Sequence, residues 1–356
     1  MTTLRLLLTS PLALSPEAGV SQVALSLAEA LSQRGHEVRT WAPPAPPPGL
    51  GPWRRRLWAV GRLETFLASQ PRFDFVDVTP VLAHRRLRRF APLVVRSVQP
   101  EWLYYLADLR AALRRPTPRR LAHRLLDLGP QLRCLAGLHA AKRILCLGNQ
   151  DRRWVATRLP WLRPRLGTWV NAPEPALQRR LAELRAGRVA PETGPLHWLW
   201  IGRWAEHKGI RRLRVFAEEW LSRRPEDRIT LAGCGPAAVA DLSAEHLAAG
   251  RLRVVPRFGR EELPALLAEH HAGLFTSQVE GWGLSVNEML EAGLTVFATP
   301  AGGVRDLAPF FPHQLRPFPP PADLEPSRLA VPEVAEGYYR RFTWAAIAEA
   351  YERELK

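Results

Sequence analysis

The sequence has few of the residues that cross-link a chain or hold a metal. Its three cysteines lie far apart, at positions 134, 146 and 234, and its ten histidines include no H-E-x-x-H motif. This argues against a disulfide framework and a cysteine-rich zinc site. No apolar run approaches the roughly 18 residues of a membrane-spanning helix, and the apolar stretch near residue 1 is too short for a signal peptide. We therefore expect a cytoplasmic protein.

Lysine is also scarce. Only Lys142, Lys208 and Lys356 are lysines, whereas the other 47 basic residues are arginine. In a chain that uses arginine at almost every basic position, a lysine in the interior of the sequence indicates that a compact ammonium is required there. Lys208 is therefore a candidate for a specific role.

What is present is a globular composition of two-domain length. The chain has 356 residues, 46% apolar and 24% charged, which suits two domains. Apolar runs rich in β-branched residues alternate with helical patterns, as is typical of βαβ units on a parallel sheet. We predict an α/β protein with Rossmann-like domains at 1–170 and 171–339 and a closing helix within 340–356. Residues 171–194, rich in proline and glycine, are predicted to connect the domains.

The strands are predicted from short apolar runs bounded by turn residues. A helix is predicted at 21–34, with Gly35 ending it. Ligands of such folds bind at the carboxyl ends of strands, so the loops that follow the strands are the candidate sites. The predicted strands are 4–8, 37–41, 73–78, 93–98 and 143–147 in the first half, and 196–201, 229–232, 252–255, 273–276 and 296–298 in the second.

Positive charge is concentrated in the first half of the chain. The net charge is +16, yet residues 1–170 hold 27 basic and 10 acidic residues, whereas residues 171–356 hold 23 and 24. A uniform bias in composition would have spread the excess over both halves. The asymmetry indicates two domains with different partners, and an anionic partner for the first.

The segment with the clearest chemical pattern is 276–306, TSQVEGWGLSVNEMLEAGLTVFATPAGGVRD. A strand is predicted to end near residue 276, and a helix is predicted to start at about 284. Between them, Gly281 and Gly283 let the backbone approach a ligand closely. The free N–H groups of Gly283, Leu284 and Ser285, together with the helix dipole, would then form an anion site that suits a diphosphate.

Two carboxylates flank this helix start. Glu288 lies four residues after Leu284, on the face that points at such a ligand, and its carboxylate can accept hydrogen bonds from two neighbouring hydroxyls, as on a ribose. Glu280 precedes the helix and would reach the group beyond the phosphates. The plainer alternative is a charge at a helix N-terminus and a surface glutamate.

A second segment, IGRWAEHKG at 201–209, combines a strand end, a loop and a helix start. Arg203 and Lys208 are predicted to lie at the strand end, where two cations can neutralise the charge that develops on a leaving phosphate. Two solvated surface cations are the alternative, and the rarity of lysine argues against it. In the first half, the loop from 10 to 20 ends at Gly19 before a helix, which is the phosphate-facing position of a Rossmann-like domain.

Taken together, these segments resemble the retaining glycosyltransferases of the GT-B fold, specifically glycosyltransferase family 4 (group 1). Glu280 and Glu288 in EGWGLSVNEMLEAG resemble the E-x7-E signature of that family, and GRWAEHKG resembles its G-R…K-G loop. LAGCGP and TPAGGVRD stand where the family has similar turns. The resemblance covers nearly the whole chain. It implies two Rossmann-like domains facing across a cleft, with the C-terminal helix crossing back to pack on the first.

The resemblance also implies residue roles. Arg203 and Lys208 would hold the donor diphosphate, and Glu280 would contact the donor sugar, which makes these three the catalytic residues. No metal or cofactor is expected, because the two cations and a helix N-terminus can replace a metal at the diphosphate of a UDP or GDP sugar. Gln99 stands where family members often have a histidine near that sugar. The residues implied to bind the donor are Gly19, Arg203, Lys208, Gly281, Gly283, Leu284, Ser285 and Glu288.

In this fold the first domain usually recognises the acceptor, so its positive charge points to an anionic glycan, a lipid-linked acceptor or a membrane surface. Basic amphipathic segments can lie on anionic lipid at the cytoplasmic face of a membrane. Alternatively, the apolar residues are core and the arginines form a solvated face. No nucleic-acid partner is expected, because zinc-finger and RNA-recognition signatures are lacking. Apolar residues recur at helical spacing in 100–115. A second apolar stripe is predicted to break at Gly129-Pro130. Its residues are Leu121, Leu125, Leu128, Leu132 and Leu135.

We therefore expect a retaining glycosyltransferase that uses a nucleotide sugar and transfers a hexose or related sugar to an acceptor hydroxyl. Two alternatives stay open. One is a GT-B enzyme of another reaction type, such as a sugar phosphorylase or a nucleotide-sugar epimerase. The other is a non-catalytic basic protein that binds polyanions.

Overall fold

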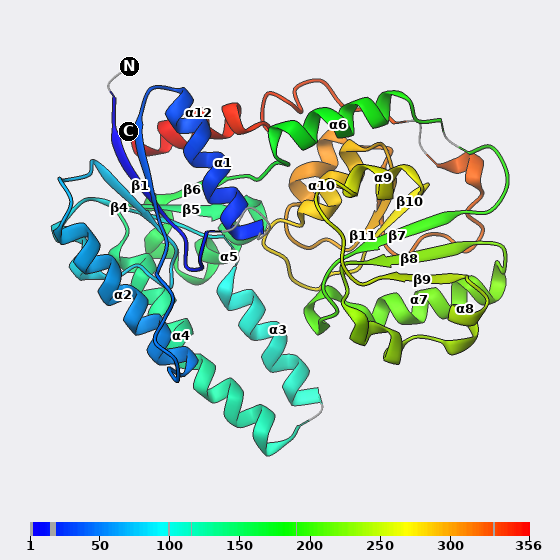
Figure 1. Cartoon of the computed structure of the whole chain (residues 1–356), viewed down its shortest axis with the longest axis horizontal. Helices are drawn as coiled ribbons and strands as arrows, with labels where there is room; N and C mark the ends of the chain where they lie inside the picture. The colour runs from blue at the N-terminus through cyan, green and yellow to red at the C-terminus, as the bar shows by residue number, and fades with distance from the viewer. Residues whose placement is uncertain (1–2, 15–18, 99, 115, 190, 330–331) are drawn as a thin grey trace. The chain divides into compact units, whose positions relative to one another are not determined.

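The computed structural model describes residues 3–14, 19–98, 100–114, 116–189, 191–329 and 332–356. The chain divides into two compact units, the first made of residues 1–171 and 341–356 and the second of residues 172–340. These boundaries lie one residue from those predicted, 170 and 339. Each unit is built on a parallel sheet with helices packed on it (Figure 1), which confirms the predicted α/β class.

In the described part of the first unit, six parallel strands follow the order β2-β1-β3-β4-β5-β6. The order reverses between β1 and β3, as in a doubly wound sheet. The strands are β1 (Arg5–Thr9), β2 (Glu37–Trp41), β3 (Phe75–Val78), β4 (Leu93–Arg96), β5 (Arg143–Leu147) and β6 (Leu166–Trp169). The helices are α1 (Gly19–Gln33), α2 (Pro52–Ala68), α3 (Glu101–Arg114), α4 (Pro118–Ala140), α5 (Gly148–Arg158) and the short η1 (Arg85–Arg89) and η2 (Pro160–Arg165).

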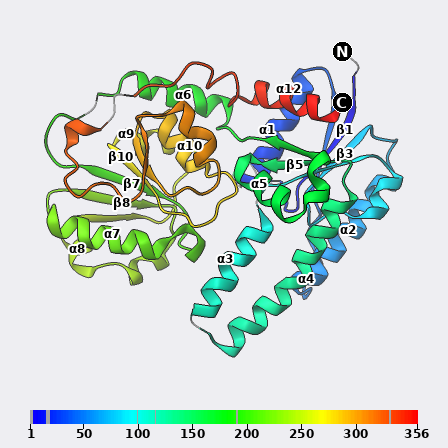
Figure 2. The same ribbon diagram turned by 180° about the vertical axis from the view of Figure 1, so that it is seen from behind.

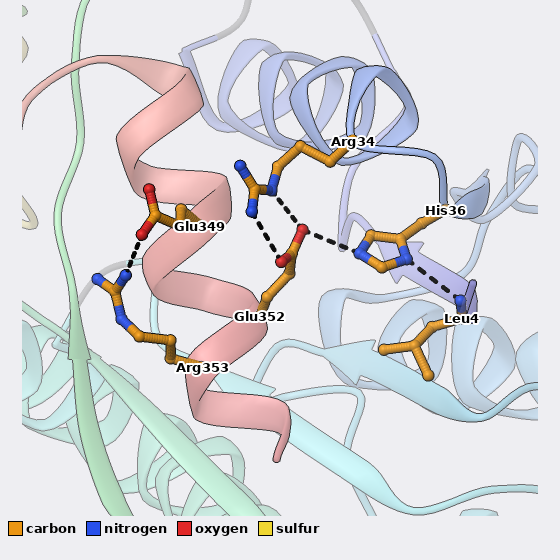
Figure 3. A network of polar contacts seen from close by, with 6 residues as sticks. All are labelled: Leu4, Arg34, His36, Glu349, Glu352 and Arg353. Atoms are coloured by element: carbon orange, nitrogen blue, oxygen red, sulfur yellow. Dashed lines mark hydrogen bonds and ion pairs between the residues drawn. The ribbon is translucent and has the colours of Figure 1, made fainter. Parts of the chain in front are cut away.

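The last helix, α12 (Trp344–Leu355), returns to the first unit and packs on α1 and β6. Glu352 joins it to the turn between α1 and β2, since its carboxylate pairs with Arg34 and accepts a hydrogen bond from His36 at 2.9 Å (Figure 3). The amide of Leu4 donates to the Nδ1 atom of His36, so the proton of the neutral ring lies on Nε2, which faces Glu352. The hydrogen bond from Arg34 holds the pKa of the Glu352 carboxyl below its usual range.

In the described part of the second unit, six parallel strands follow the order β12-β11-β10-β7-β8-β9. This order reverses between β7 and β10. The strands are β7 (His197–Ile201), β8 (Arg228–Ala232), β9 (Leu252–Val255), β10 (Ala272–Phe275), β11 (Thr295–Ala298) and β12 (Leu315–Pro317). The helices are α6 (Pro175–Ala186), α7 (Ile210–Arg223), α8 (Ala244–Ala248), α9 (Leu263–Ala268), α10 (Leu284–Glu291), α11 (Val304–Leu307) and the short η3 (Glu206–Lys208), η4 (Pro236–Asp241), η5 (Ala308–Phe310) and η6 (Pro326–Arg328).

A cluster of buried aromatic side chains in the core of the second unit packs against its central strand, β7. Trp198, on β7, is fully buried and packs edge-on against Phe216 and Trp220 of α7. Aromatic side chains of this size bury more apolar surface than any other residue type. They hold β7 in the middle of the sheet, so the loop that follows β7 starts from a rigid support.

One sequence prediction about a connection was wrong. Residues 171–194, predicted to connect the domains, belong from residue 172 on to the second unit and include the 12-residue helix α6. Leu177 and Leu181 on this helix are buried, and α6 packs on α9 and α10 of the second unit. Pro175 lies at its first turn, where a missing N–H costs nothing. The strands β6 and β12 were not predicted at all.

The predicted break at Gly129-Pro130 was also wrong, because α4 runs without interruption through Pro130 for 23 residues. A proline frees the carbonyl four residues earlier, here that of Leu126, whose side chain is exposed, so water can satisfy it. Figures 1 and 2 show α3 and α4 side by side as a helical hairpin that extends away from the sheet of the first unit. Among the described residues, no helix is both long and apolar enough to span a bilayer.

Candidate active site

The predicted site residues of the second unit lie at the point where the strand order reverses. β7 and β10 pair in parallel, with Trp198 opposite Ala272, so their carboxyl ends lie together at one edge of the sheet. The loop after β7 carries Arg203 and Lys208, and the loop after β10 carries Glu280 and Gly283. In open α/β sheets a ligand binds in the crevice at this position.

The two loops are held together by backbone contacts. The hydroxyl of Thr276 donates to the carbonyl of Lys208 at 2.8 Å, and the amide of Gln278 donates to the carbonyl of His207 at 2.8 Å. Gly209 has a left-handed φ of 72°, and a Cβ at this position would overlap the carbonyl oxygen of Thr276. Only glycine allows this close approach, which fixes the position of the neighbouring Lys208.

Lys208 and Glu280 form an ion pair across the two loops. Glu280 is only 6% exposed, and the hydroxyl of Ser277 also donates to its Oε1 atom at 2.9 Å. A buried carboxylate with one cation and one hydroxyl donor is well satisfied. The structure therefore joins the predicted cation and the predicted sugar-facing carboxylate directly.

Arg203 does not take part in this pair. It is exposed and, within the described part of the chain, it makes no ion pair. The structure thus places one of the two predicted cations against a carboxylate and leaves the other in solvent.

The start of α10 has the features of an anion site. Gly283 occupies the N-cap with a left-handed φ of 88°, and no side chain caps the helix. The N–H groups of the first turn, at Leu284 and Ser285, therefore have no intrahelical acceptor and lie at the positive end of the helix dipole. Gly281 lies buried in the loop before them.

The loop after β11 packs on the loop that carries Glu280. The amide of Gly303 donates to the carbonyl of Trp282 at 2.8 Å. A Cβ on Gly302 would lie 2.9 Å from the Cβ of Glu280, closer than side chains tolerate. The glycine pair of TPAGGVRD thus lets this loop pack directly on the loop that carries Glu280.

Glu288, one turn inside α10, has a partner that sequence reasoning missed. It is 3% exposed, and Arg260 pairs with its Oε1 atom at 2.7 Å. The Nε and Nη2 atoms of Arg260 are buried and have no hydrogen-bond partner among the described residues. No motif marks Arg260, because it follows β9 and meets Glu288 only through the fold.

Behind α10, a buried polar network fixes the helix. The Oε1 atom of Glu291 accepts hydrogen bonds from Gln178 at 3.0 Å, from Asn287 at 3.0 Å and from the hydroxyl of Tyr338 at 2.6 Å. Asn287 in turn accepts from the indole N–H of Trp282 at 2.8 Å. This network ties α10 to α6 and to the loop that carries Gly283.

Glu291 gives the protein a pH dependence that can be measured. Burial raises the pKa of its carboxyl from 4.5 to about 7, so between these values the folded state keeps a proton that the unfolded chain releases. The contribution of Glu291 to stability should therefore be largest below about pH 4.5 and be lost as the pH rises to 7, by on the order of 3 kcal/mol. Glu291→Gln, which stays neutral, should lose less stability than the wild type between pH 5 and pH 8 in urea denaturation.

Glu269→Gln is the matched control, because Glu269 is exposed and pairs with Arg253 on the surface of the same unit. It should keep the wild-type difference between the two pH values. The same pH difference in Glu291→Gln as in the wild type would show that Glu291 is not the titrating group.

Some predictions fall in the first unit or outside the described residues. Gly19, predicted to lie in the loop before a helix that starts at residue 21, is the first residue of α1, and its role in donor binding stays a prediction. Gln99, the residue at the place of the family's histidine, lies outside the described residues. Among those that are described, no three histidine, cysteine, aspartate or glutamate side chains gather as a metal site; that no metal is needed stays a prediction.

Comparison with known proteins finds a likeness in the second unit. A family model described as glycosyl transferases group 1 matches residues 187–309. This part of the chain is therefore similar to group 1 glycosyltransferases. It contains both loops, Lys208 and the two glutamates. A curated relative, the uncharacterized glycosyltransferase YqgM of Bacillus subtilis (strain 168), is 31% identical over 110 residues, which span 30% of this chain and 30% of the length of YqgM.

Solved structures extend the likeness from residues 187–309 to nearly the whole chain. Sucrose-phosphate synthase of Thermosynechococcus elongatus has a TM-score of 0.71 at 17% identity and covers 98% of this chain and 97% of its own. WaaG, a glycosyltransferase involved in lipopolysaccharide biosynthesis, has a TM-score of 0.62 at 15% identity, with 98% and 90% covered. HepE of Anabaena, in complex with UDP, has a TM-score of 0.55 at 16% identity, with 98% and 94% covered. At these identities the likeness shows the fold, which is the predicted GT-B fold with two Rossmann-like domains.

Proposed function

We propose that the protein is a retaining glycosyltransferase that transfers a sugar from a nucleotide diphosphate sugar to an acceptor hydroxyl. The observation that carries the proposal is the pair of Lys208 and Glu280 at the strand-order reversal of a unit that is similar to group 1 glycosyltransferases. The pair lies in the loops beside an uncapped helix N-terminus. A cation, an anion site and a carboxylate are the groups that this reaction needs.

The charges of the reaction match these groups. When the glycosidic bond to the diphosphate breaks, negative charge develops on the leaving phosphate and positive charge on the sugar. Lys208 and the N–H groups at the start of α10 would stabilise the first charge, and Arg203, free in solvent, would add a second cation. Glu280 would face the second charge, as a carboxylate does in glycoside chemistry.

Donor binding would exchange partners within this site. In the structure Lys208 neutralises Glu280, and Arg260 neutralises Glu288. A bound diphosphate would draw Lys208 to itself and release Glu280 for the sugar. The two hydroxyls of a ribose would replace Arg260 on Glu288, because a carboxylate can accept both of their hydrogen bonds. We propose a UDP or GDP sugar as the donor, and the UDP bound to HepE favours UDP.

The acceptor is proposed to be an anionic glycan or a lipid-linked sugar bound by the first unit. The basic excess of residues 1–170 supports this, because the second unit, which would hold the donor, has almost no net charge. Separating the products of a reaction with a UDP sugar distinguishes transfer from phosphorolysis or epimerisation, which yield a sugar phosphate or an isomeric donor.

Donor binding is tested by thermal unfolding with UDP, GDP, ADP and their sugar conjugates. We expect one diphosphate, at about 100 times its Kd, to stabilise the protein by about 2.7 kcal/mol, seen as a rise of several degrees in Tm. Glu288→Ala should abolish the rise, because the ribose loses its acceptor. Glu269→Ala removes an exposed partner of Arg253 and should leave the rise intact.

Arg260→Ala separates the loss of the Glu288 carboxylate from the loss of its ion pair with Arg260. It frees Glu288 without removing it, so the rise should persist. Equal responses of the wild type to every nucleotide, or an undiminished rise in Glu288→Ala, would contradict the proposed donor site and favour the basic surface as the working site.

A further inference from the structure

The helical hairpin of α3 and α4 exposes leucines that the core does not use. Leu125 is 72% exposed and Leu126 is 76% exposed, and Leu113 at the end of α3 is also exposed. Leu128 and Leu132 complete an exposed stripe on α4. We call Leu125, Leu126, Leu128 and Leu132 the leucine face.

The leucine face follows from the periodicity of the helix. Positions 125, 128 and 132 are three and four residues apart and therefore share one side of α4, and Leu126 lies beside them. The opposite side of α4 packs on α3 and η1, with Cys134 and Leu138 buried. In the predicted stripe, Leu125, Leu128 and Leu132 are exposed and are not core residues, whereas Leu135 at its end packs against the core.

The charge around the leucine face is positive. Asp108 and Asp127 are both paired with Arg124, at 2.8 and 3.0 Å, so one arginine offsets half of their charge. The two helices nevertheless hold six arginines and only three acidic residues. The exposed arginines near the ends of the two helices, in contrast, make no ion pair in the part of the chain that the structure describes. These arginines are Arg110, Arg114 and Arg119.

We propose that the leucine face and these arginines form a docking surface for an anionic lipid bilayer. An amphipathic helix with leucines on one side and arginines beside them inserts its apolar face at the boundary between headgroups and acyl chains. The arginines then meet the negative surface potential of the lipid. The proposal rests on α3 and α4 alone and stands apart from the transfer reaction.

Charge decides between a bilayer and a second copy of the chain as the occupant. A symmetric dimer places the same patch of both subunits in contact, so it would bring the arginines of one hairpin against those of the other. Such like-charge contacts are unfavourable. An anionic bilayer satisfies the leucines and the arginines at once.

Sedimentation with vesicles tests the docking surface. We expect the protein to bind vesicles made of an equal mixture of phosphatidylglycerol and phosphatidylcholine. It should bind vesicles of phosphatidylcholine alone far more weakly. Leu125→Ser/Leu126→Ser should lower the partition coefficient by about 10-fold or more. Arg114→Gln/Arg119→Gln should lower it by about 10-fold at low salt and make it less sensitive to added salt.

Matched controls come from the second unit. Val215→Ser/Val239→Ser removes two other exposed apolar side chains, and Arg212→Gln/Arg214→Gln removes two exposed arginines of α7. Both should bind like the wild type. Because all the changed side chains are exposed, each variant should keep the wild-type Tm, which shows that it folds.

Three outcomes would overturn the proposal: no binding of the wild type to anionic vesicles, equal binding of the leucine variant, or equal binding to both lipid mixtures. A concentration-dependent dimer that the leucine variant abolishes, without vesicle binding, would instead assign the face to a second copy. Nucleotide stabilisation measured on the same variants separates this proposal from the transferase. Vesicle binding without nucleotide stabilisation would support the docking surface and contradict the proposed function. Nucleotide stabilisation without vesicle binding would contradict only the docking surface.

Discussion

Lys208→Ala should lower the turnover number by at least about 100-fold, which corresponds to about 2.7 kcal/mol of lost transition-state stabilisation. The reason is that the ammonium of Lys208, which would already contact the bound diphosphate, would stabilise the further negative charge that develops as the leaving phosphate separates. The KM for the donor should also rise, but by a smaller factor, because the start of α10 still holds the diphosphate in the ground state. Initial rates over a range of donor concentrations separate the two constants.

Two variants make this result specific. Lys142→Ala removes an exposed lysine of the first unit that lies over the ring of Phe75, and its turnover should equal that of the wild type. Lys208→Arg keeps the charge, but its wide planar guanidinium cannot replace a compact ammonium against Glu280, so we expect turnover to stay reduced. Unchanged turnover in Lys208→Ala would remove the role assigned to this residue.

The sequence points to Lys208 and the two glutamates because their signals are local. Lysine is rare in this chain, and the glutamates flank a glycine-rich helix start at fixed spacing. Arg260 has no such signal, since it lies 28 residues before Glu288 and reaches it only when β9 and α10 are placed by the sheet. Pairing partners that come from different strands of a parallel sheet are set by topology, which no local pattern contains.

Local patterns also determine which strands and helices could be predicted. Most of the ten predicted strands are buried runs of apolar residues, and the structure has a strand at each of the ten. The two that were missed are short strands at the ends of their sheets, and β12 (Leu315–Pro317) is only three residues long. The helix α6 was missed because Pro175 and Gly187 flank it, and these residues were interpreted as a linker although they are also ordinary signals of a helix start and end.

Asp77→Ala should destabilise the protein by about 3–5 kcal/mol, which is a large part of the 5–15 kcal/mol that holds a typical domain together. Asp77 on β3 and Arg96 on β4 are both fully buried, and the Nε atom of Arg96 donates to both carboxylate oxygens, at 3.1 and 2.9 Å. Without Asp77 the guanidinium would be an uncompensated charge in the core. The urea midpoint measures the loss.

The surroundings of Arg96 make the loss large. Its Nη1 and Nη2 atoms are buried without a hydrogen-bond partner among the described residues, and its guanidinium lies over the ring of Trp169, 4.8 Å from the centroid. Among the residues that the structure describes, Asp77 is the one carboxylate that pairs with Arg96. Asp74→Ala is the control, because Asp74 accepts a hydrogen bond from the amide of Arg5 at an exposed position, and it should cost about 1 kcal/mol.

Asp77 also anchors the closing helix. The hydroxyl of Tyr351 on α12 donates to its Oδ2 atom at 2.7 Å, and burial raises the pKa of that hydroxyl well above its usual value, so it stays a donor. Asp77→Ala/Arg96→Met should recover part of the stability lost in Asp77→Ala, because an apolar side chain then replaces the unpaired charge. It should not restore the hydrogen bond of Tyr351, so protection of α12 amides from hydrogen exchange should stay lower than in the wild type. If the double variant were no more stable than Asp77→Ala, the loss would come from the anchor of α12 and not from the buried charge of Arg96.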